Sequence, residues 1–565
     1  MARLKKDTRA LFFVTSPRTP DKIIPEIELL NDSFAGKKWN SGTQRAFMNK
    51  LIESSYYESK KLPSDEALAA RDRITRAPKA LGFVDLKPTI SLTDAGERLI
   101  SGKRTEEVIL RQLLKFQVPS PYHPAPNNNV KFWVRPYLEL LRLIDTLEEL
   151  TFDEMMTFGM QLTNYMEFDD IVSKIQEFRM NKAQRKGQYK QFFREVIDGE
   201  IRKIYHQEIL KGKTKTRESD DKSESNFIKT KRGNLRDYTD ACIRYLRSTG
   251  LVAISQKGRS LSIVPDKKKE VDFILKNVER DPVFVSDEAK YKQHLFDGTK
   301  PRLLTDNCDH LVEYIVSAGA YTRSNLECMT LDELKDLREK IVEDKRNSII
   351  SGQVEKLKSY AQYSDVIDIY KAIKKKDDSL YDPPLMLEWN TWRAMTMING
   401  GNIIGNFKID DEGRPMSTAQ GNMPDIVCDY GDFDVTVEVT TQVGQRQYDT
   451  ESEPVARHLG KHKGKTGKET FCLFIAPKVN PACIAHFFVL SKVNVTHYGG
   501  KATIVPMELD TFMKMVSNSY KAKYVPTPQH MRDIFNFAKQ TAEIAEDENQ
   551  WYKAIQEFAQ NWVAA

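Results

Sequence analysis

Gly421-Asn-Met-Pro-Asp-Ile-Val-Cys-Asp-Tyr-Gly-Asp-Phe-Asp-Val-Thr-Val-Glu-Val-Thr-Thr441 alternates with period two on both sides of Gly431-Asp432. This alternation is typical of β-strands, and Gly followed by Asp suits a two-residue type II′ hairpin turn. The stretch therefore predicts two antiparallel strands that are joined at Gly431-Asp432.

Counting outward from the turn gives the register of this hairpin. One face is apolar throughout and consists of the pairs Tyr430–Phe433, Cys428–Val435 and Ile426–Val437. The other face carries the acids, in the pairs Asp429–Asp434, Val427–Thr436 and Asp425–Glu438. The register thus predicts that Asp425 and Glu438 are neighbours across the two strands.

Two facing carboxylates need a partner. Directly opposed residues have Cβ atoms about 4.5–5.5 Å apart, and like charges at that separation destabilise a sheet. A divalent cation between Asp425 and Glu438 makes the arrangement favourable, and carboxylate oxygens suit Mg²⁺ or Mn²⁺. Such an ion lowers the pKa of a water molecule and neutralises charge on a phosphate. The alternative interpretation is an ordinary solvated acidic face.

The segments around the hairpin predict further parts of a site. Residues 387–395 read as a helix from which Glu388 reaches the metal. Residues 402–408 read as the strand before the hairpin, and 471–476 as a buried strand after it. The hairpin is therefore expected to belong to a larger sheet with a helix on each side in the chain.

A basic segment follows the hairpin. A helix is expected to begin near Glu451, with Pro454 at a permitted early position, and Glu451 or Glu453 and His458 are candidates to face the site. The next residues read as a Gly-spaced basic loop that suits a phosphate backbone, with the lysines Lys461, Lys463, Lys465 and Lys468.

Two segments of the N-terminal half share another pattern. In 80–99 and in 245–263, an amphipathic helix ends at a glycine, Gly82 or Gly250, and two short alternating strands follow. Helices followed by a small hairpin are typical of a winged helix-turn-helix. The helical segment 68–76 before the first hairpin is basic, as expected of a reader of the DNA major groove.

The basic residues of this first segment are the candidate DNA contacts: Arg71, Arg73, Arg76 and Lys79. A solvated helix face is the alternative for any one of them, and winged helices also mediate protein contacts. The stretch 132–209 reads as helical, and the polar run 211–225 as a loop. Leu331, Leu334, Leu337 and Ile341 form one apolar stripe in a charged helical segment.

The composition limits the possible classes of protein. The chain has 565 residues, which predicts about two to four domains, and a net charge of +6, which does not identify a nucleic-acid binder. Its six cysteines form no CxxC pair, so no zinc site of the usual spacing is visible. No apolar run approaches the length of a membrane span, and we expect a cytoplasmic protein.

These segments predict a multidomain α+β chain. We expect two DNA-recognition subdomains at 1–130 and 131–285, both winged-helix-like and the second also helical. A helical linker at 286–376 follows, and then a nuclease domain with a mixed central sheet at 377–565. The boundary near 374–384 is marked by charge and a double proline.

The last segment carries a family resemblance. Pro424-Asp425 followed by Glu438-Val439-Thr440 resembles the PD-(D/E)xK nuclease signature. The chain resembles the AlwI-type family of type IIS restriction and nicking endonucleases nearly end to end, including the stretches 69–76 and 453–458. The resemblance implies that the metal ligands are Asp425, Glu438, Val439 and Glu388, and that Glu451 and His458 complete the catalytic set.

One residue departs from the signature. Thr440 stands where the motif has a lysine. His458, Arg457 or Lys461 must then act in its place, or the metal alone activates water. A packed or capping role is the alternative for His458.

The resemblance implies an endonuclease that binds a short asymmetric duplex and uses Mg²⁺, with Mn²⁺ as a substitute, to cut a few base pairs outside it. Its partners are double-stranded DNA and, for cutting both strands, a second copy or a second nuclease subunit. The rival interpretations are a strand-specific nicking enzyme, a non-enzymatic tandem winged-helix protein, and a structure-directed repair or RNA nuclease. A methyltransferase is disfavoured, because Asp382-Pro-Pro-Leu385 lacks the aromatic residue of its motif.

Overall fold

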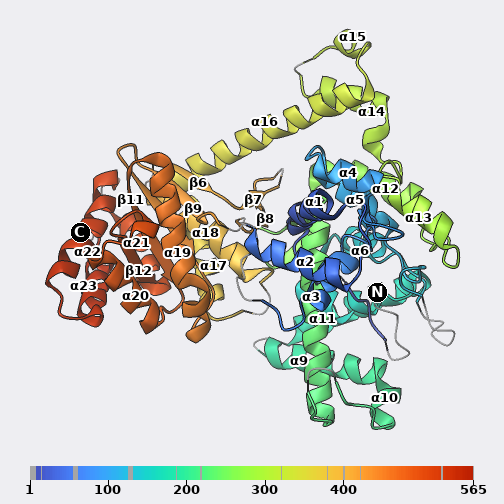
Figure 1. Cartoon of the computed structure of the whole chain (residues 1–565), viewed down its shortest axis with the longest axis horizontal. Coiled ribbons are helices and arrows are strands. Elements are labelled where there is room, and N and C mark those ends of the chain that lie inside the picture. Colours follow the sequence, from blue (N-terminus) through green and yellow to red (C-terminus); the bar gives the residue numbers. More distant parts are fainter. Residues whose placement is uncertain are drawn as a thin grey trace. The chain divides into compact units, whose positions relative to one another are not determined.

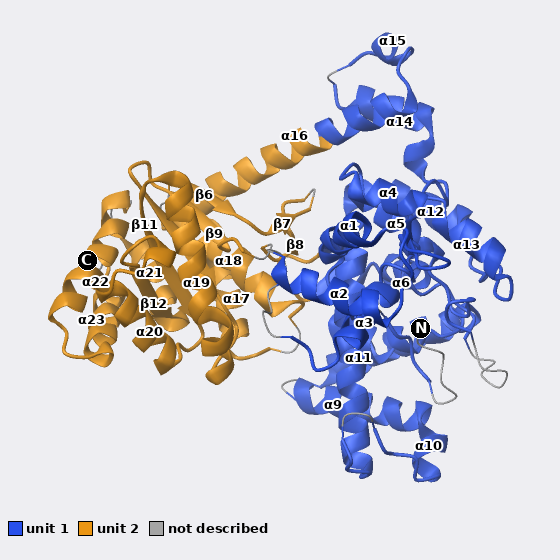
Figure 2. Ribbon diagram, viewed as in Figure 1, with its two compact units in different colours: residues 1–253, 260–341 blue, residues 254–259, 342–565 orange. Residues whose placement is uncertain are grey.

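The computed structural model contains two compact units (Figure 2). Unit 1 comprises residues 1–253 and 260–341, and unit 2 comprises residues 254–259 and 342–565. The structure describes residues 8–13, 15–54, 57, 62–124, 132–185, 188–216, 219–319, 321–377, 380–398, 401–410, 412–419, 422–522 and 526–563. The predicted boundary at 130–131 lies outside them.

Unit 1 is mainly helical (Figure 1). Its helices are α1 (Ile23–Phe34), α2 (Ser41–Glu53), α3 (Glu66–Arg76), α4 (Asp94–Ile100), α5 (Thr105–Lys115), α6 (Pro136–Leu147), α7 (Phe152–Thr157), α8 (Phe168–Gln184), α9 (Tyr189–Ile204), α10 (His206–Leu210), α11 (Glu224–Arg247), α12 (Lys268–Asn277), α13 (Glu288–Phe296), α14 (Cys308–Ser317) and α15 (Arg323–Leu326). Its strands are β1 (Val84–Asp85), β2 (Ser91–Leu92), β3 (Glu149–Thr151), β4 (Val252–Ile254) and β5 (Ser260–Ile263). Among the described residues, no helix is both long and apolar enough to cross a membrane.

Both small hairpins of unit 1 form where the sequence predicts strands. β1 pairs with β2 in antiparallel fashion, and β5 lies between β3 and β4 in a second sheet. Gly82 and Gly250 have positive φ angles of 79° and 69°, as expected of residues just past a helix. The basic helix α3 precedes the first hairpin. The helix and hairpin elements are therefore present, while their assignment as winged helices stays a prediction.

The turn of the second hairpin has protein partners within unit 2. Gly258 accepts a backbone hydrogen bond from Tyr381 at 2.7 Å, and Arg259 forms an ion pair with Asp377 at 3.0 Å. A side chain at position 258 would collide with Met386, because a Cβ atom on this glycine would lie 2.9 Å from the Met386 Cε. This turn is therefore held against the segment that precedes and begins α18 (Pro383–Met397).

A long helix, α16 (Leu331–Lys358), connects the two units. Its predicted apolar stripe packs against α14 and α15 in unit 1, where Leu334 is buried and Leu337 and Ile341 lie against the same cluster. The division between the units falls within this helix, at 341–342. The predicted helical character of the connecting segment is thus observed.

Unit 2 contains a five-stranded mixed sheet in the order β12-β11-β10-β9-β6. Strands β9 and β6 run antiparallel to their neighbours, while β10, β11 and β12 are parallel. Its strands are β6 (Asn402–Gly405), β7 (Lys408–Ile409), β8 (Pro415–Ser417), β9 (Ile426–Asp429), β10 (Phe433–Val439), β11 (Glu469–Ala476) and β12 (Ile504–Glu508). Its helices besides α18 are α17 (Tyr363–Lys374), α19 (Gln445–Thr466), α20 (Pro481–Lys492), α21 (Leu509–Lys521), α22 (Pro528–Ile544) and α23 (Glu548–Gln560).

Helices cover both faces of this sheet. Phe535 of α22 stacks on Phe471, which pairs with Val435 on the apolar face of the hairpin. On the acidic face, α19 lies over β10 through hydrogen bonds from its histidines. Because both faces are covered, the acidic side chains of β10 are buried rather than solvated: Asp434 is 2% exposed and Glu438 is 7% exposed.

The structure corrects three expectations in unit 2. The helix predicted to begin near Glu451 begins at Gln445, after Gly444 with φ of 68°, so Pro454 lies inside it and removes one helical hydrogen bond. Lys461 and Lys463 consequently lie on this helix and not in a loop. The predicted strand 402–408 ends at Gly405, and the ribbon β7–β8 follows before the hairpin.

Candidate active site

The hairpin has the register that the sequence predicts. Cα partners are Asp434↔Asp429, Val435↔Cys428, Thr436↔Val427 and Val437↔Ile426. Tyr430 donates its backbone N–H to Phe433 at 3.0 Å, and Gly431 has a φ of 93°, which a type II′ turn requires at its first central position. The next pair in the same register is Asp425 and Glu438. Two carboxylate pairs therefore lie on one face: the outer pair, Asp429 and Asp434, and the inner pair, Asp425 and Glu438.

The outer pair is neutralised by the chain itself. Lys468 donates hydrogen bonds to Asp429 at 2.7 Å and to Asp434 at 3.3 Å. His462 on α19 also lies 2.9 Å from Asp434. The hydrogen bond from Lys468 holds the pKa of Asp429 below its usual value. A cation thus already balances this pair.

The inner pair receives no such cation from the described residues. Asp425 accepts a hydrogen bond from the backbone N–H of Val439 at 2.8 Å, and Glu438 lies 2.8 Å from Nδ1 of His458. Burial raises the pKa of both acids well above the usual range, and the charge of Glu438 raises that of Asp425 further. Among the residues that the structure describes, no lysine or arginine side chain donates a hydrogen bond to either acid.

A third carboxylate comes from α18. Glu388 is 7% exposed and accepts a hydrogen bond from the backbone N–H of Ala419 at 2.9 Å. Burial raises its pKa well above the usual range, and the charge of Asp425 adds to this effect. Glu388 is thus a third buried acid of unit 2, and its role as a metal ligand stays a prediction.

A fourth carboxylate, that of Glu451, comes from α19. It is bound by Thr440, the residue at the position where the signature has a lysine. Thr440 donates its hydroxyl to Glu451 at 2.9 Å and its backbone N–H to Ile475 at 3.1 Å. Next to burial, the charge of Glu451 is the largest influence that raises the pKa of Glu438. The five predicted catalytic residues therefore meet in one region of unit 2.

The three candidates for the missing lysine have different surroundings. His458 alone of the three bonds to the inner pair. Arg457 is held by Glu453 at 3.0 Å and by Asn422, and Lys461 is exposed on α19. Burial lowers the pKa of His458 to about 4, and the charges of Arg457 and Lys461 contribute. The imidazole is therefore neutral at neutral pH.

The donor set suits a hard divalent cation. Two buried carboxylates with raised pKa values repel each other, and a cation between them reverses that interaction. Glu388 adds oxygen atoms, and Val439 can add a carbonyl. In the described part of the chain, however, no three Asp, Glu, His or Cys side chains already converge closely enough to form a metal-binding group. Binding thus requires side-chain adjustment around the inner pair.

The candidate DNA-binding residues differ in exposure. Arg71 is exposed on α3, and Arg76 pairs with Asp72 one turn away at 2.8 Å. Arg73 bonds to Glu26, a buried acid of α1, at 3.0 Å. Lys79 is 5% exposed and lies over the ring of Tyr122 at 4.8 Å, and burial lowers its pKa.

These placements favour a DNA contact for Arg71 and do not favour one for Arg73 or Lys79, whose charged groups have partners inside unit 1. In unit 2, Lys463 donates to the carbonyl of Gly499 at 2.7 Å, while Lys461 is exposed. Sequence position alone does not separate these cases, because the partners are distant along the chain.

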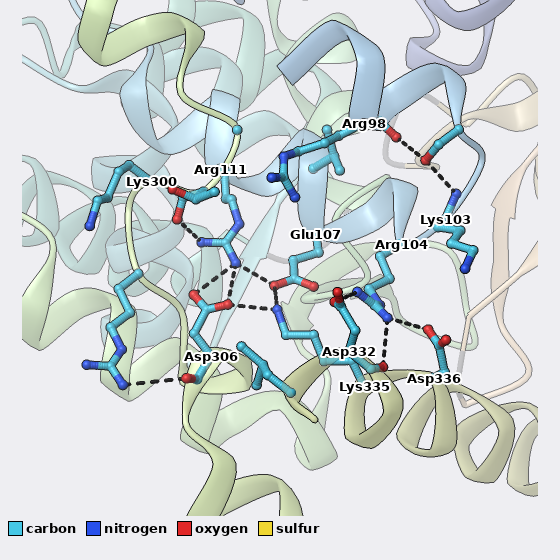
Figure 3. Close-up of a pocket in the computed structure, with 16 residues that line it drawn as sticks. Arg98, Lys103, Arg104, Glu107, Arg111, Lys300, Asp306, Asp332, Lys335 and Asp336 are labelled. Carbon is cyan, nitrogen blue, oxygen red and sulfur yellow. Dashed lines mark hydrogen bonds and ion pairs between the residues drawn. The ribbon is translucent and has the colours of Figure 1, made fainter. Parts of the chain in front are cut away.

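A polar cavity of about 570 Å³ lies in unit 1 (Figure 3). Arg111 and Lys335 both bond to Glu107 and Asp306, at distances of 2.6–2.9 Å. Arg104 bonds to Asp332 at 2.7 Å and to Asp336. The acids that line this cavity are therefore compensated by the chain, and the network joins the start of α16 to α5.

Sequence reasoning missed two contacts of the site. Lys468 was expected to contact phosphate but neutralises the outer pair, and His462 was not singled out. The available signal was the spacing of His458 and His462, which lie one helical turn apart and therefore on one face. Their acidic partners, Glu438 and Asp434, likewise share one face of β10.

The profile of a family described as AlwI restriction endonuclease matches residues 79–515. No curated protein matches the sequence significantly. One similar solved structure is the small subunit (R.BspD6I2) of the heterodimeric restriction endonuclease R.BspD6I, with 24% identity and a TM-score of 0.30 over 35% of this chain and 99% of that chain. Another is the BpuJ1 endonuclease binding domain in complex with pyrene- and phenanthrene-modified DNA, with 14% identity and a TM-score of 0.33 over 53% of this chain and 100% of that chain.

Proposed function

The chain belongs to the AlwI restriction endonuclease family, and from this premise we propose that it is a type IIS site-specific DNA endonuclease that depends on Mg²⁺. It binds a short asymmetric duplex sequence and hydrolyses a phosphodiester bond a few base pairs to one side. The family match covers well over half of the chain and identifies a DNA endonuclease. The distance between the recognition sequence and the cleavage position is part of the proposal. The dependence on Mg²⁺ is also part of it.

One contrast supports a metal at the inner pair. The outer and inner carboxylate pairs lie on the same hairpin and the same face. Within the described ranges, a lysine bonds to the outer pair and none bonds to the inner pair. Accordingly the pKa of Asp429 is lowered, while burial raises the pKa values of Asp425 and Glu438. The charge of Glu438 raises that of Asp425 further, and the charge of Glu451 raises that of Glu438 further. A buried pair of carboxylates without a cation costs free energy, which a divalent ion can offset.

The ligands in this proposal are Asp425 and Glu438, assisted by Glu388 and Val439. A bound Mg²⁺ or Mn²⁺ would polarise the scissile phosphate and lower the pKa of a water molecule. The chain supplies the geometry: the N–H of Val439 orients the Asp425 carboxylate, and the N–H of Ala419 orients Glu388.

His458 takes the place of the missing lysine in this proposal. As a neutral imidazole it orients Glu438 through Nδ1. Its Nε2 is buried, has no hydrogen-bond partner among the described residues, and is available to a polar atom of the substrate. Thr440 holds Glu451 beside the pair and so keeps a further carboxylate near the reacting phosphate. His458 acts from α19, and Thr440 acts from the position directly after β10.

Unit 1 carries recognition in this proposal. The helix-and-hairpin elements at α3–β2 and α11–β5 act as winged helices, and the exposed Arg71 contacts the DNA backbone. The nuclease region has the PD-(D/E)xK architecture, with the order α18, β6, hairpin, α19 and β11. A second copy or a second nuclease subunit is needed to cut both strands, and without it the enzyme nicks one strand.

The test is cleavage of plasmid DNA with and without Mg²⁺. We expect Asp425→Ala and Glu438→Ala to abolish cleavage while gel-shift binding of the same DNA persists. Cleavage by both variants at the wild-type rate would remove the assignment. Run-off sequencing of the products reports the site, the offset and the strand together. It separates type IIS cutting from nicking and from sequence-independent cleavage.

A further inference from the structure

Asn406 lies on the same row of the sheet as the inner carboxylate pair. Strands β6 and β9 pair in the register Asn402↔Asp429 through Gly405↔Ile426. One further step in this register places Asn406 opposite Asp425, and residues directly opposite each other share a face of the sheet. Three neighbouring chain segments thus place Asn406, Asp425 and Glu438 side by side.

Asn406 donates hydrogen bonds to two consecutive backbone carbonyl groups, those of Pro424 and Asp425. Its backbone N–H donates to the carbonyl of Asp425 at 2.9 Å, and its side-chain Nδ2 donates to the carbonyl of Pro424 at 2.6 Å. Asp425 lies just before β9, where the ladder has ended. These two bonds therefore take the place of strand pairing in fixing the backbone that carries the carboxylate.

The side-chain carboxylate of Asp425 is fixed as well. Its Oδ2 accepts the N–H of Val439 on β10 at 2.8 Å. On the upstream side, Asn422 has a positive φ of 71° and is held by Arg457 from α19. The segment 422–425 is thus braced from the end of β6, from β10 and from α19, and the Asn406 amide supplies the side-chain contact from the end of β6.

We propose that Asn406 is a positioning residue for the reaction, a role that rests on the proposed function of Asp425. It touches neither the metal nor the substrate and acts by fixing where the Asp425 carboxylate lies relative to Glu438. A misplacement of about 1 Å at such a group lowers a rate about 10²-fold. The amide is required, because a carboxylate at 406 would set an oxygen against the Pro424 carbonyl and add charge beside two acids.

Asn402 provides a matched control. It is the same residue type on the same face, at the first residue of β6, whereas Asn406 directly follows the last. It lies in the row of the outer pair, opposite Asp429. It is exposed. A general effect of weakening β6 would appear in Asn402→Ala as well as in Asn406→Ala, whereas an effect on the inner pair would appear only in the latter.

The experiment compares the full-length wild type, Asn406→Ala, Asn406→Asp and Asn402→Ala on supercoiled plasmid DNA. We measure the single-turnover cleavage rate against Mg²⁺ concentration, gel-shift binding of the plasmid without Mg²⁺, and the thermal midpoint. We expect Asn406→Ala to lower the rate about 10–100-fold. The Mg²⁺ concentration at half-maximal rate should rise, DNA binding should be unchanged, and Asn402→Ala should behave as the wild type.

Each outcome decides the question. A wild-type rate and Mg²⁺ response in Asn406→Ala overturn the proposal, and so does an equal loss in Asn402→Ala. If Asn406→Ala lowers the thermal midpoint, the test depends on Asn406→Asp, which keeps the shape of the side chain. A wild-type rate in Asn406→Asp overturns the proposal. Asp425→Ala separates the two levels: its cleavage at the wild-type rate rejects the proposed function, and its inactivity beside a wild-type Asn406→Ala rejects only the role of Asn406.

Discussion

Nδ1 of His458 lies 2.8 Å from Oε1 of Glu438, and the other ring nitrogen is buried with no hydrogen-bond partner in the part of the chain that the structure describes. Burial lowers the pKa of His458 to about 4, so the ring is neutral at neutral pH. When Glu438 is ionised, Nδ1 must therefore carry the ring proton and donate it to the carboxylate. This contact is the first target for mutation.

His458→Asn should retain more cleavage than His458→Gln or His458→Ala. The amide of Asn can occupy the position of Nδ1 and still donate to Glu438, while Gln reaches toward Nε2. If His458 acts by orienting Glu438, we expect a loss of about 10–100-fold in the Ala variant and a smaller loss in the Asn variant. Plasmid cleavage rates at saturating Mg²⁺ measure this. An Asn variant as inactive as the Ala variant would assign the role to Nε2.

Removing one charge of the inner pair should stabilise the protein when Mg²⁺ is absent. Asp425→Asn and Glu438→Gln relieve the repulsion between two buried carboxylates, and a gain of about 1 kcal/mol corresponds to about 2–4 °C in a unit of this size. Thermal unfolding measures the shift. Mg²⁺ should raise the midpoint of the wild type, as ligand binding to the folded state requires, but not that of either variant.

The control for this experiment is the outer pair. Asp429→Asn removes a carboxylate that already has Lys468 as its partner, so it should not stabilise the protein and should leave the Mg²⁺ effect intact. A wild type whose midpoint does not respond to Mg²⁺ would contradict a metal at the inner pair.

The hairpin and its acids could be predicted because they depend on local rules. Period-two alternation and the Gly431-Asp432 turn determine which residues face each other, and the observed partners follow from counting. The face of the hairpin on which each side chain lies also follows from this local alternation. For this reason Asp425 and Glu438 could be paired before any tertiary contact was known.

The remaining contacts depend on segments that meet only in the folded chain. Nothing near Asn402 indicates that β6 pairs with β9, so the place of Asn406 beside Asp425 could not be counted from the sequence. The early start of α19 was missed because Pro454 suggested a first turn, whereas the helix tolerates this proline in its interior. Because of this error, Lys461 was expected in a loop, whereas it lies on α19.

Lys468→Ala should destabilise unit 2, because it leaves Asp429 and the buried Asp434 without their cation. We expect a lower free energy of unfolding, measured with urea. Lys465→Ala, an exposed lysine of α19, removes the same charge and should change stability by less than about 0.5 kcal/mol. Equal effects of the two substitutions would contradict the role of Lys468.

The same ion pair predicts a pH dependence. Lys468 holds the pKa of Asp429 below the usual value of 3.8, so the folded state binds fewer protons than the unfolded state as the pH falls through that value. The stabilisation is complete above pH 3.8 and is lost as the pH falls through the folded pKa. Acid titrations of stability should therefore be steeper in the wild type than in Lys468→Ala as the pH falls below 3.8. Parallel curves would contradict this.

Arg71 and Arg73 should respond differently to substitution, although both lie on α3. Arg71→Ala removes an exposed charge, so it should weaken DNA binding and reduce the slope of log K against log salt concentration by about 0.9. Arg73→Ala should instead destabilise unit 1, because it leaves the buried Glu26 unpaired, at a cost of about 3–5 kcal/mol. Gel shifts over a salt series and urea unfolding distinguish the two. An unchanged salt slope in Arg71→Ala would remove it from the DNA interface.

Lys335→Met should destabilise unit 1, because Lys335 shares two partly buried acids with Arg111 (Figure 3). Without the lysine, Glu107 and Asp306 face a single cation, and leaving a partly buried acid without its partner costs about 1–3 kcal/mol. Asp332→Asn breaks an ion pair whose acid is 83% exposed and should cost less than about 1 kcal/mol. Urea unfolding compares the two variants.

A double variant separates charge balance from packing. Glu107→Gln added to Lys335→Met leaves Arg111 with Asp306 alone, one cation for one acid, so the double variant should be more stable than the sum of the single effects by about 0.5–3 kcal/mol. If the lysine matters only through the packing of its methylene groups, the two effects will add. Because Lys335 lies at the start of α16, additivity would also mean that charge does not tie this helix to α5.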